Sequence, residues 1–298
     1  MNLQWFDNYF CNDDAIEFII NQKLIDNVRF CNKDHQNENM VLIRENRDKM
    51  KYIWMCPVCK RTVSLLKGSI FEDSKVSIKM ILKIIYMWSH SFSVKLTSHE
   101  TGISEHSVSS IFNQIKRGCY QYMNREDRAK IGGFNKTVEI DETLFSKRKY
   151  QKGRLLNQVW VFGGICCEDN NNFLEIVPDR KASTLFQIIN KNVNVGTLLM
   201  SDLWSGYKII DDQPHPQPFM HLSVNHEKNF IDPKTGANTQ KCERMWRDFK
   251  EKKNQSQGIP RKDYDLYITE YLWRKTLKTS KKDLFIASCE MLSQVKFS

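Results

Sequence analysis

Three carboxylates occupy positions at which acidic side chains could share metal ions. Asp141 lies within the alternating stretch TVEIDETLF, Asp202 follows the apolar run LLM, and Glu243 lies in the first turns of an amphipathic segment. Functional groups gather beyond the strand ends of open α/β sheets, so the three side chains could converge. Divalent cations would relieve their repulsion, and oxygen ligands suit Mg²⁺ or Mn²⁺. The alternative is that all three are exposed acids at element ends.

Such a site could act on phosphodiesters. Two ions about 4 Å apart can hold the attacking and the leaving oxygen of a phosphoryl transfer. His226, in the sequence VNH at the end of an expected strand, could contact the scissile phosphate or be a structural histidine. Glu142 points to the opposite face of its strand from Asp141, where we expect a structural role. We expect three nearby aromatic residues to pack in the core: Trp204, Tyr207 and Trp246. For Trp204 and Tyr207 the alternative is contact with DNA.

A cysteine pair indicates a second kind of metal site. Cys56 and Cys59 form CPVC, a C-x₂-C knuckle of zinc-ligand spacing, and Cys31 with His35 in RFCNKDH are the best upstream partners. Either of two residues could replace His35 as the fourth ligand: Asp34 or Cys11. These ligand types suit a structural Zn²⁺, whereas the alternative is free buried cysteines. We interpret the remaining cysteines as core thiols: Cys119, Cys166, Cys167, Cys242 and Cys289.

The composition favours a nucleic acid partner. Among 298 residues, Lys and Arg number 45 against 35 for Asp and Glu, which makes the formal net charge +10. A basic chain of this kind attracts polyanions, and DNA or RNA is the first candidate. No apolar run approaches the ~20 residues of a membrane span, so no membrane partner is expected. The N-terminus lacks the basic and apolar regions of a secretory signal, which favours metal ligation over disulfides.

The pattern of elements predicts a mixed α/β layer from residue 137 onward. Successive stretches read as strand, strand, strand, helix, strand, strand and helix: TVEIDETLF, NQVWVFGGICC, NNFLEIVPD, ASTLFQIINKNV, TLLMSDLW, HLSVNH and QKCERMWRDFKEKK. Gly132 and Gly133 mark a domain boundary before this layer. Residues from Tyr264 onward predict two amphipathic helices.

The segment KLTSHETGISEHSVSSIFNQIKR fits a helix-turn-helix. Leu96 begins its first helix, Gly102 makes the turn, Ser104 caps the second helix, and Val108 and Ile111 face inward. An ordinary helical hairpin would match the same pattern. We expect DNA contacts from its polar and basic residues: Lys95, Glu105, His106, Ser109, Ser110, Asn113, Lys116 and Arg117.

A basic loop, SKRKYQKGR, joins the first two strands of the layer. A charge run of this kind is usually a solvated face, but beside an acidic metal site it favours contact with the DNA backbone. Its basic residues are Lys147, Arg148, Lys149, Lys152 and Arg154.

Several motifs, in order, resemble the Merlin group of eukaryotic DNA transposases, which are related to bacterial insertion-sequence transposases. The resemblance covers roughly residues 30 to 275, and its motifs are VEIDETLFSKRKYQKGR, VWVFGG, VPDRKASTL, SDLWSGY, VNHEKNFIDPKTGANTQKCERMW and YLWR. It implies an RNase H-like core in which Asp141, Asp202 and Glu243 are the Asp-Asp-Glu metal ligands. Gln240 stands where bacterial relatives typically have Asn. The cysteine spacing before Cys56 also departs from the family pattern.

The resemblance implies a cut-and-paste transposase that binds terminal inverted repeats and joins the freed 3′-hydroxyl ends to target DNA with two Mg²⁺ or Mn²⁺ ions. It also implies a homodimer or higher oligomer on paired ends, in the nucleus of a eukaryotic host or on cytoplasmic DNA otherwise. The alternatives are a domesticated DNA-binding regulator and an RNase H-like nuclease without strand transfer. We expect an N-terminal helix, a zinc ribbon, a helix-turn-helix domain, the catalytic domain and C-terminal helices at residues 1–27, 28–68, 69–132, 133–256 and 257–298.

Overall fold

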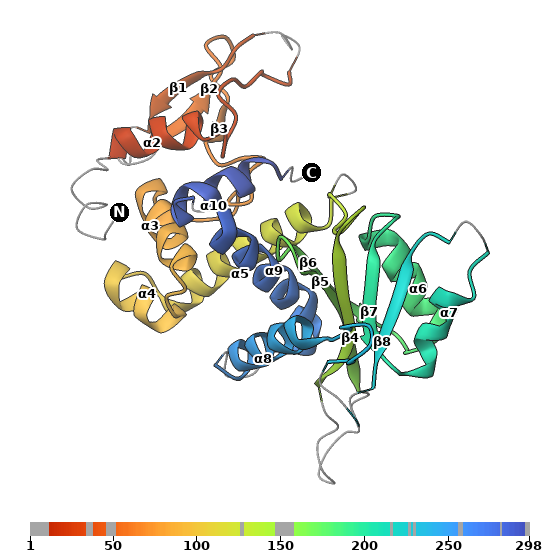
Figure 1. Cartoon of the computed structure of the whole chain (residues 1–298). Helices are drawn as coiled ribbons and strands as arrows, with labels where there is room; N and C mark the ends of the chain where they lie inside the picture. The colour runs from red at the N-terminus through yellow and green to blue at the C-terminus, as the bar shows by residue number, and fades with distance from the viewer. Residues whose placement is uncertain are drawn as a thin grey trace. The chain divides into compact units, whose positions relative to one another are not determined.

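The computed structural model divides the chain into two compact units (Figure 1). One unit comprises Met1–Arg125 with Leu277–Ser298, and the other comprises Glu126–Thr276. The described residues are 12–33, 38–45, 52–125, 128–146, 158–214, 217–225, 228, 231–255, 259–280 and 282–295. Among the described helices, none combines the length and apolar character that a membrane span requires.

The first unit combines a small sheet with a helical core. Helix α3 is strongly apolar, and its Ile84, Ile85 and Met87 are fully buried. The three strands form an antiparallel sheet in the order β1-β2-β3. The described elements are α2 (Asn12–Asn21), β1 (Val41–Arg44), β2 (Tyr52–Met55), β3 (Thr62–Ser64), α3 (Ile78–Ser89), α4 (Val94–Thr101), α5 (Glu105–Met123) and α10 (Leu284–Ser293).

Helices α4 and α5 follow one another through a tight turn. The Ser93 side chain accepts a hydrogen bond from the Leu96 backbone N–H (3.1 Å), so α4 begins at Val94 and not at Leu96. Gly102 ends α4 in the left-handed region (φ 68°), where glycine carries no steric cost. Ser104 caps α5 by accepting from the Ser107 N–H (3.3 Å), as the sequence predicts.

The second unit is built on a mixed five-stranded sheet in the order β6-β5-β4-β7-β8. Strands β6, β5 and β4 are antiparallel, whereas β4, β7 and β8 are parallel. This confirms the predicted mixed α/β layer. The strands are β4 (Thr137–Ser146), β5 (Val159–Cys166), β6 (Asn172–Val177), β7 (Leu198–Asp202) and β8 (Met220–Val224). Helices of this unit are α6 (Ala182–Asn192), the short α7 (Lys208–Asp211), α8 (Gln240–Gln255) and α9 (Tyr264–Ser280), which extends into the other unit.

Helices cover both faces of this sheet (Figure 1), and β4 contributes alternate side chains to each. Val138 and Ile140 belong to the buried core that includes Leu185 of α6. Phe145, on the opposite face, stacks on Phe249 of α8 at 5.2 Å between ring centroids. Glu139 accepts a hydrogen bond from the Cys242 N–H of α8, and Asp141 shares its register in β4, so Asp141 lies on the α8 face.

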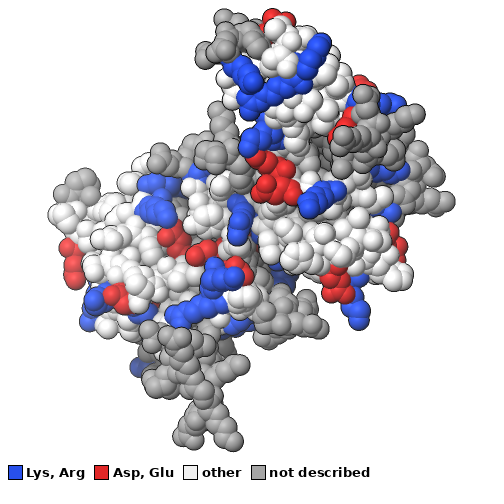
Figure 2. All heavy atoms as spheres, turned by 180° about the vertical axis from the view of Figure 1, so that it is seen from behind, with Lys and Arg blue, Asp and Glu red and all other residues white. Residues whose placement is uncertain are grey.

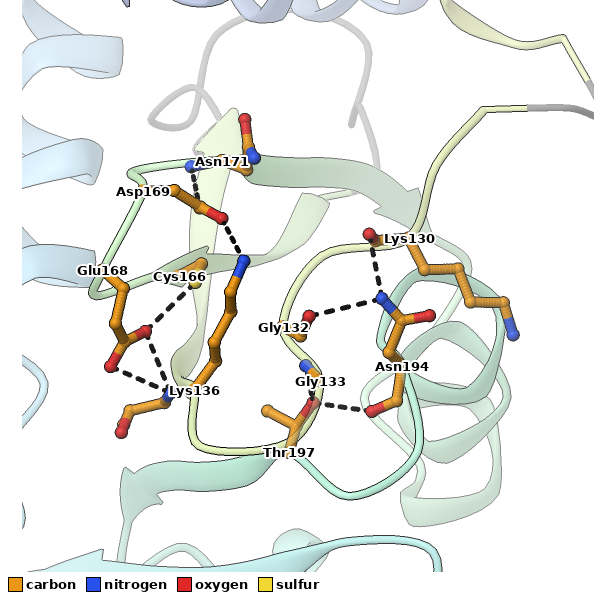
Figure 3. A network of polar contacts seen from close by, with 11 residues as sticks. Lys130, Gly132, Gly133, Lys136, Cys166, Glu168, Asp169, Asn171, Asn194 and Thr197 are labelled. Atoms are coloured by element: carbon orange, nitrogen blue, oxygen red, sulfur yellow. Dashed lines mark hydrogen bonds and ion pairs between the residues drawn. The ribbon is translucent and has the colours of Figure 1, made fainter.

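A polar network ties together the beginnings of β4 and β7 (Figure 3). Thr197 Oγ1 accepts from the Gly133 N–H (2.8 Å) and donates to the Asn194 carbonyl (2.6 Å). At Gly132 (φ 75°) a Cβ would lie 2.5 Å from that same Oγ1, so a side chain there would displace it. Glu168, in the turn after β5, accepts from the Thr137 N–H (3.0 Å). The network thus fixes where β4 and β7 start relative to each other.

The described cysteines form no disulfide. Four of those interpreted as core thiols are buried as predicted: Cys119, Cys166, Cys242 and Cys289. Cys167 differs, because it is only half-buried just beyond the end of β5 and its thiol donates to Glu139 (3.5 Å).

Candidate active site and cysteine cluster

Asp141 and Asp202 lie side by side on neighbouring parallel strands. Thr137 of β4 pairs with Leu198 of β7, and Glu139 pairs with Met200. The same register, continued by two residues, places Asp141 opposite Asp202 and on the same face of the sheet. The Asp202 charge acts on the Asp141 carboxyl, as expected for two acids on neighbouring strands.

The environment of Asp141 disfavours its charged form. Burial, followed by the charges of Glu142 and Asp202, raises the pKa of Asp141 to about 7. The hydrogen bond from the Glu142 N–H to Asp141 Oδ1 (2.8 Å) opposes this rise in pKa without cancelling it. A buried carboxyl among other acids gains its charge when a cation binds beside it. The electrostatics therefore fit a divalent metal ion.

Glu243 enters the site from the first turn of α8. Its backbone N–H donates to the Thr239 carbonyl (2.9 Å), and Thr239 Oγ1 donates to Glu243 Oε1 (3.3 Å). Asp141 and Glu243 line one open cleft of about 630 Å³. Its other lining residues are Thr143, Trp246, Arg247, Lys250 and Glu251. Among the described residues, Asp202 does not line this cleft.

Gly163 lets α8 lie close to Asp141. It pairs with Asp141 across β4 and β5. A Cβ at this position would lie 2.8 Å from the ring of Trp246 and 2.5 Å from Leu174. The first glycine of VWVFGG thus clears space for Trp246. As predicted, Trp246 is a core residue, at 4% exposure.

Arg180 is a residue to which the sequence analysis assigned no role, although it lies in the motif VPDRKASTL. Its guanidinium lies over the rings of Trp160 (4.4 Å) and Trp204 (4.5 Å) and forms an ion pair with Glu142. Trp204 in turn donates its backbone N–H to Asp202 Oδ1 (3.0 Å). In the sequence, Arg180 is marked only as a basic residue within VPDRKASTL, and nothing local links it to Trp160 or Trp204.

Glu142 is buried on the face of β4 away from Asp141, as its position in the strand predicts. Its side chain is 3% exposed, and its second oxygen accepts from the Tyr207 hydroxyl. Burial and the Glu142 charge hold the pKa of Tyr207 well above its usual range, so that hydroxyl stays protonated and able to donate. Glu142 is therefore paired on both oxygens.

Three cysteine thiols converge in the first unit. The Sγ atoms of Cys31, Cys56 and Cys59 all lie within 4.8 Å of one another. The Cys31 and Cys59 sulfurs are 3.7 Å apart, close to the ~3.8 Å between two thiolates on one tetrahedral Zn²⁺ with bonds of about 2.3 Å. Lys60, at φ 57°, closes the knuckle by donating its N–H to the Cys56 carbonyl (3.0 Å). The donor set and its spacing fit zinc.

Several predicted site residues lie outside the described residues. They are His226, the fourth-ligand candidates His35, Asp34 and Cys11, and the basic loop residues Lys147, Arg148, Lys149, Lys152 and Arg154. The predicted helix-turn-helix contacts are described. Most are exposed, namely Lys95, Glu105, His106, Ser110, Asn113 and Arg117, whereas Ser109 and Lys116 are half-buried.

Charge on the face seen in Figure 2 is mixed. Lys and Arg side chains are distributed among clusters of Asp and Glu, without one continuous basic area on that face. The net charge of +10 is therefore not gathered into a single patch there.

Comparison with known proteins identifies the second unit. Residues 131–276 match the ISXO2-like transposase domain family. A Haemophilus influenzae protein described as an uncharacterized transposase-like protein is 26% identical over 99 residues, which is 33% of this chain and 76% of the relative. The match to the family covers the mixed sheet together with α8 and most of α9. This part of the chain is therefore similar to ISXO2-like transposase domains of the DDE type.

Solved structures with similar chains include an intasome and a transpososome. One is the simian T-cell lymphotropic virus intasome in complex with the PP2A regulatory subunit B56 gamma, with 12% identity, 65% of this chain and 67% of that chain covered, and a TM-score of 0.31. Another is the pre-cleavage Mos1 transpososome, with 8% identity, 73% and 79% covered, and a TM-score of 0.23. The similarity of the second unit to transposase domains depends on the sequence match over residues 131–276 and not on these structures.

Proposed function

We propose that this chain is a cut-and-paste DNA transposase of the Merlin type that cleaves element ends and joins their 3′-hydroxyls to target DNA. The observation that carries the proposal is the register that sets Asp141 beside Asp202 on parallel strands, within an ISXO2-like transposase domain. Glu243 completes the acidic set from α8, on the same cleft as Asp141.

Asp141, Asp202 and Glu243 would hold two Mg²⁺ or Mn²⁺ ions. When bound, such ions neutralise phosphate charge and activate the attacking oxygen for in-line phosphoryl transfer. Asp141 must lose its proton to take part, and its pKa of about 7 makes this loss easy near neutral pH. Water and then the 3′-hydroxyl would be the successive nucleophiles, so no protein nucleophile is required. His226 would contact the scissile phosphate.

Residues on the cleft would hold the DNA strand near these carboxylates. Arg247 and Lys250 follow Glu243 at i+4 and i+7, which places them on one side of α8. Both are exposed and line the cleft with Glu243 and Asp141. Their charges would balance backbone phosphates next to the scissile bond. The basic loop between β4 and β5 would add further contacts to the backbone.

The first unit would recognise the terminal inverted repeats. Helix α5 would enter the major groove as the second helix of a helix-turn-helix, with Glu105, His106, Ser109, Ser110 and Asn113 facing base edges. Lys95, Lys116 and Arg117 would contact phosphates. A structural Zn²⁺ held by Cys31, Cys56 and Cys59, with His35 as fourth ligand, would stabilise the adjoining ribbon. Two ends must be joined together, so a homodimer or higher oligomer would assemble on paired ends, in the nucleus of a eukaryotic host.

A strand-transfer assay tests this function. Purified full-length protein is incubated with Mn²⁺ or Mg²⁺, a plasmid, and DNA carrying the inverted repeats that flank its gene, with Asp202→Asn as the matched control. Metal-dependent cleavage at the repeat tip followed by joining to the plasmid, lost in the variant, is the expected result. Repeat binding without cleavage would favour a domesticated DNA-binding protein. Cleavage without joining would favour an RNase H-like nuclease.

A further inference from the structure

Glu139 is a buried carboxylate that the metal site does not use directly. It precedes Asp141 by two residues on β4, so both side chains leave the strand on the α8 face. Glu139 is only 2% exposed. One of its oxygens accepts from the Cys242 backbone N–H (2.9 Å), and the other accepts from the Cys167 thiol (3.5 Å). Both oxygens are therefore occupied inside the unit.

The hydrogen bond from Cys242 satisfies a backbone N–H donor in the first turn of α8. Helix α8 begins at Gln240, so the N–H of Cys242, its third residue, has no acceptor within the helix. The next N–H, that of Glu243, is the first to find one, in the Thr239 carbonyl. Glu139 supplies the missing acceptor from 103 residues away, at the positive end of the helix dipole.

A second contact binds the same turn to the sheet. Lys241, the neighbour of Cys242, donates its Nζ to the Cys167 carbonyl, and the Cys167 thiol donates to Glu139. The first turn of α8 is thus attached to β4 through Glu139 and to the end of β5 through Cys167. Cys242 is fully buried against the sheet, which leaves Glu243 at the edge of the cleft.

We infer that Glu139 is a positioning residue of the proposed metal site: its carboxylate holds the first turn of α8 on the strand that carries Asp141, and so sets where Glu243 lies. This inference depends on the proposed function for the role of Glu243. Both Glu139 oxygens face the start of α8 and Cys167, so we assign Glu139 to holding the helix and not to the set of proposed ligands.

Two substitutions at Glu139 distinguish a residue that positions α8 from a residue that binds the metal. Glu139→Gln keeps an oxygen that can accept from the Cys242 N–H, whereas Glu139→Ala removes the acceptor. Metal-free full-length protein is studied by amide hydrogen exchange, and Mn²⁺ affinity is then measured by titration. We expect Glu139→Ala to speed exchange at the Cys242 amide about fivefold. We expect it to weaken Mn²⁺ binding by roughly 10-fold to 100-fold, the usual effect of losing a residue that orients a ligand.

The glutamine variant should rescue both measurements to within about threefold of the wild type, since an amide oxygen can replace the carboxylate at the Cys242 N–H. Glu175→Ala is the matched control. Glu175 also reaches from the sheet to a helix, accepting from Asn192 at the end of α6 (2.7 Å), and its loss should leave Mn²⁺ affinity unchanged. If Glu139→Ala does not fold, Glu139→Asp replaces it, because the shorter side chain withdraws the carboxylate from Cys242.

Three outcomes would overturn the inference. Unchanged exchange at Cys242 in Glu139→Ala would show that Glu139 does not hold the helix. Loss of Mn²⁺ binding in Glu139→Gln with normal exchange would make Glu139 a ligand. A wild-type protein that binds no Mn²⁺ would remove the proposed function and the metal-site role with it, while the exchange data would still decide whether Glu139 holds α8.

Discussion

Glu142 forms an ion pair with Arg180 on the face of β4 opposite to that of its neighbour Asp141. Because Arg180 also lies over Trp204, whose N–H donates to Asp202, the pair connects the strands that carry both proposed aspartate ligands. Two acids that are adjacent in sequence thus have different surroundings. Asp141 lines the cleft, whereas Glu142 binds Arg180 and Tyr207 on the opposite face of the sheet.

The Glu142–Arg180 pair should contribute to stability. Arg180→Met would leave the buried Glu142 charge with only the Tyr207 hydroxyl as partner. The Arg180 side chain is about one-third exposed, so we expect a loss of roughly 1–3 kcal/mol in the free energy of unfolding. Urea unfolding of wild type and Arg180→Met measures this difference in the free energy of unfolding. The double variant Glu142→Gln/Arg180→Met should recover part of this loss. A double variant less stable than either single one would contradict a coupled pair.

The three acids should be needed for cutting and not for binding. Asp141→Asn, Asp202→Asn or Glu243→Gln removes one charged ligand and should reduce cleavage of repeat DNA by at least about 10³-fold. Gel-shift binding to the repeats should remain within about threefold of wild type, since the first unit makes these contacts. A variant that still cleaves would exclude its residue from the site.

Asp141 should make the metal-free protein less stable as the pH rises. Its pKa is raised from 3.8 to about 7, so between these values the folded state binds more protons than the unfolded state. Stability from the neutral carboxyl is present at low pH and is lost as the pH rises through about 7. In EDTA, Asp141→Asn should therefore melt a few degrees above wild type at pH 8, and close to wild type at about pH 4. An equal difference at both values would contradict the raised pKa.

Metal affinity should follow the same ionisation. Mn²⁺ must displace the Asp141 proton below about pH 7, so apparent affinity should fall by up to tenfold for each pH unit below that point. Titrations between pH 5.5 and 8.5 would measure the slope, with Ca²⁺ binding to EDTA as a check of the method. A pH-independent affinity would mean that Asp141 is ionised before the metal binds.

The cysteine cluster should hold one zinc ion per chain. Cys56→Ser should lose the metal, unfold the small sheet and weaken repeat binding, because it removes one of the three converging thiols that would ligate the ion. Elemental analysis and gel shifts measure these effects. Cys167→Ser, in the other unit, is the control and should retain zinc. Wild-type protein without zinc would disprove the site.

The sequence by itself determined the local elements and the residues of interest. Alternation in TVEIDETLF placed Asp141 and Glu142 on opposite faces of one strand, and the C-x₂-C spacing paired Cys56 with Cys59. Ser104 and Gly102 marked the ends of α4 and α5, since capping and positive φ depend on neighbouring residues only. The order of strands and helices followed from the same short-range patterns, and the structure confirms it.

Tertiary structure alone decided how distant residues meet. The register of β4 on β7, which sets Asp141 beside Asp202, depends on contacts such as Gly133 with Thr197, 64 residues apart. Glu139 reaches Cys242 across 103 residues, and no spacing rule links a strand carboxylate to the start of a remote helix. Periodicity reports which face of an element is buried, but not which partner covers it. That choice is made when the whole sheet and its helices pack together, because only then is each buried polar group matched to an acceptor or donor.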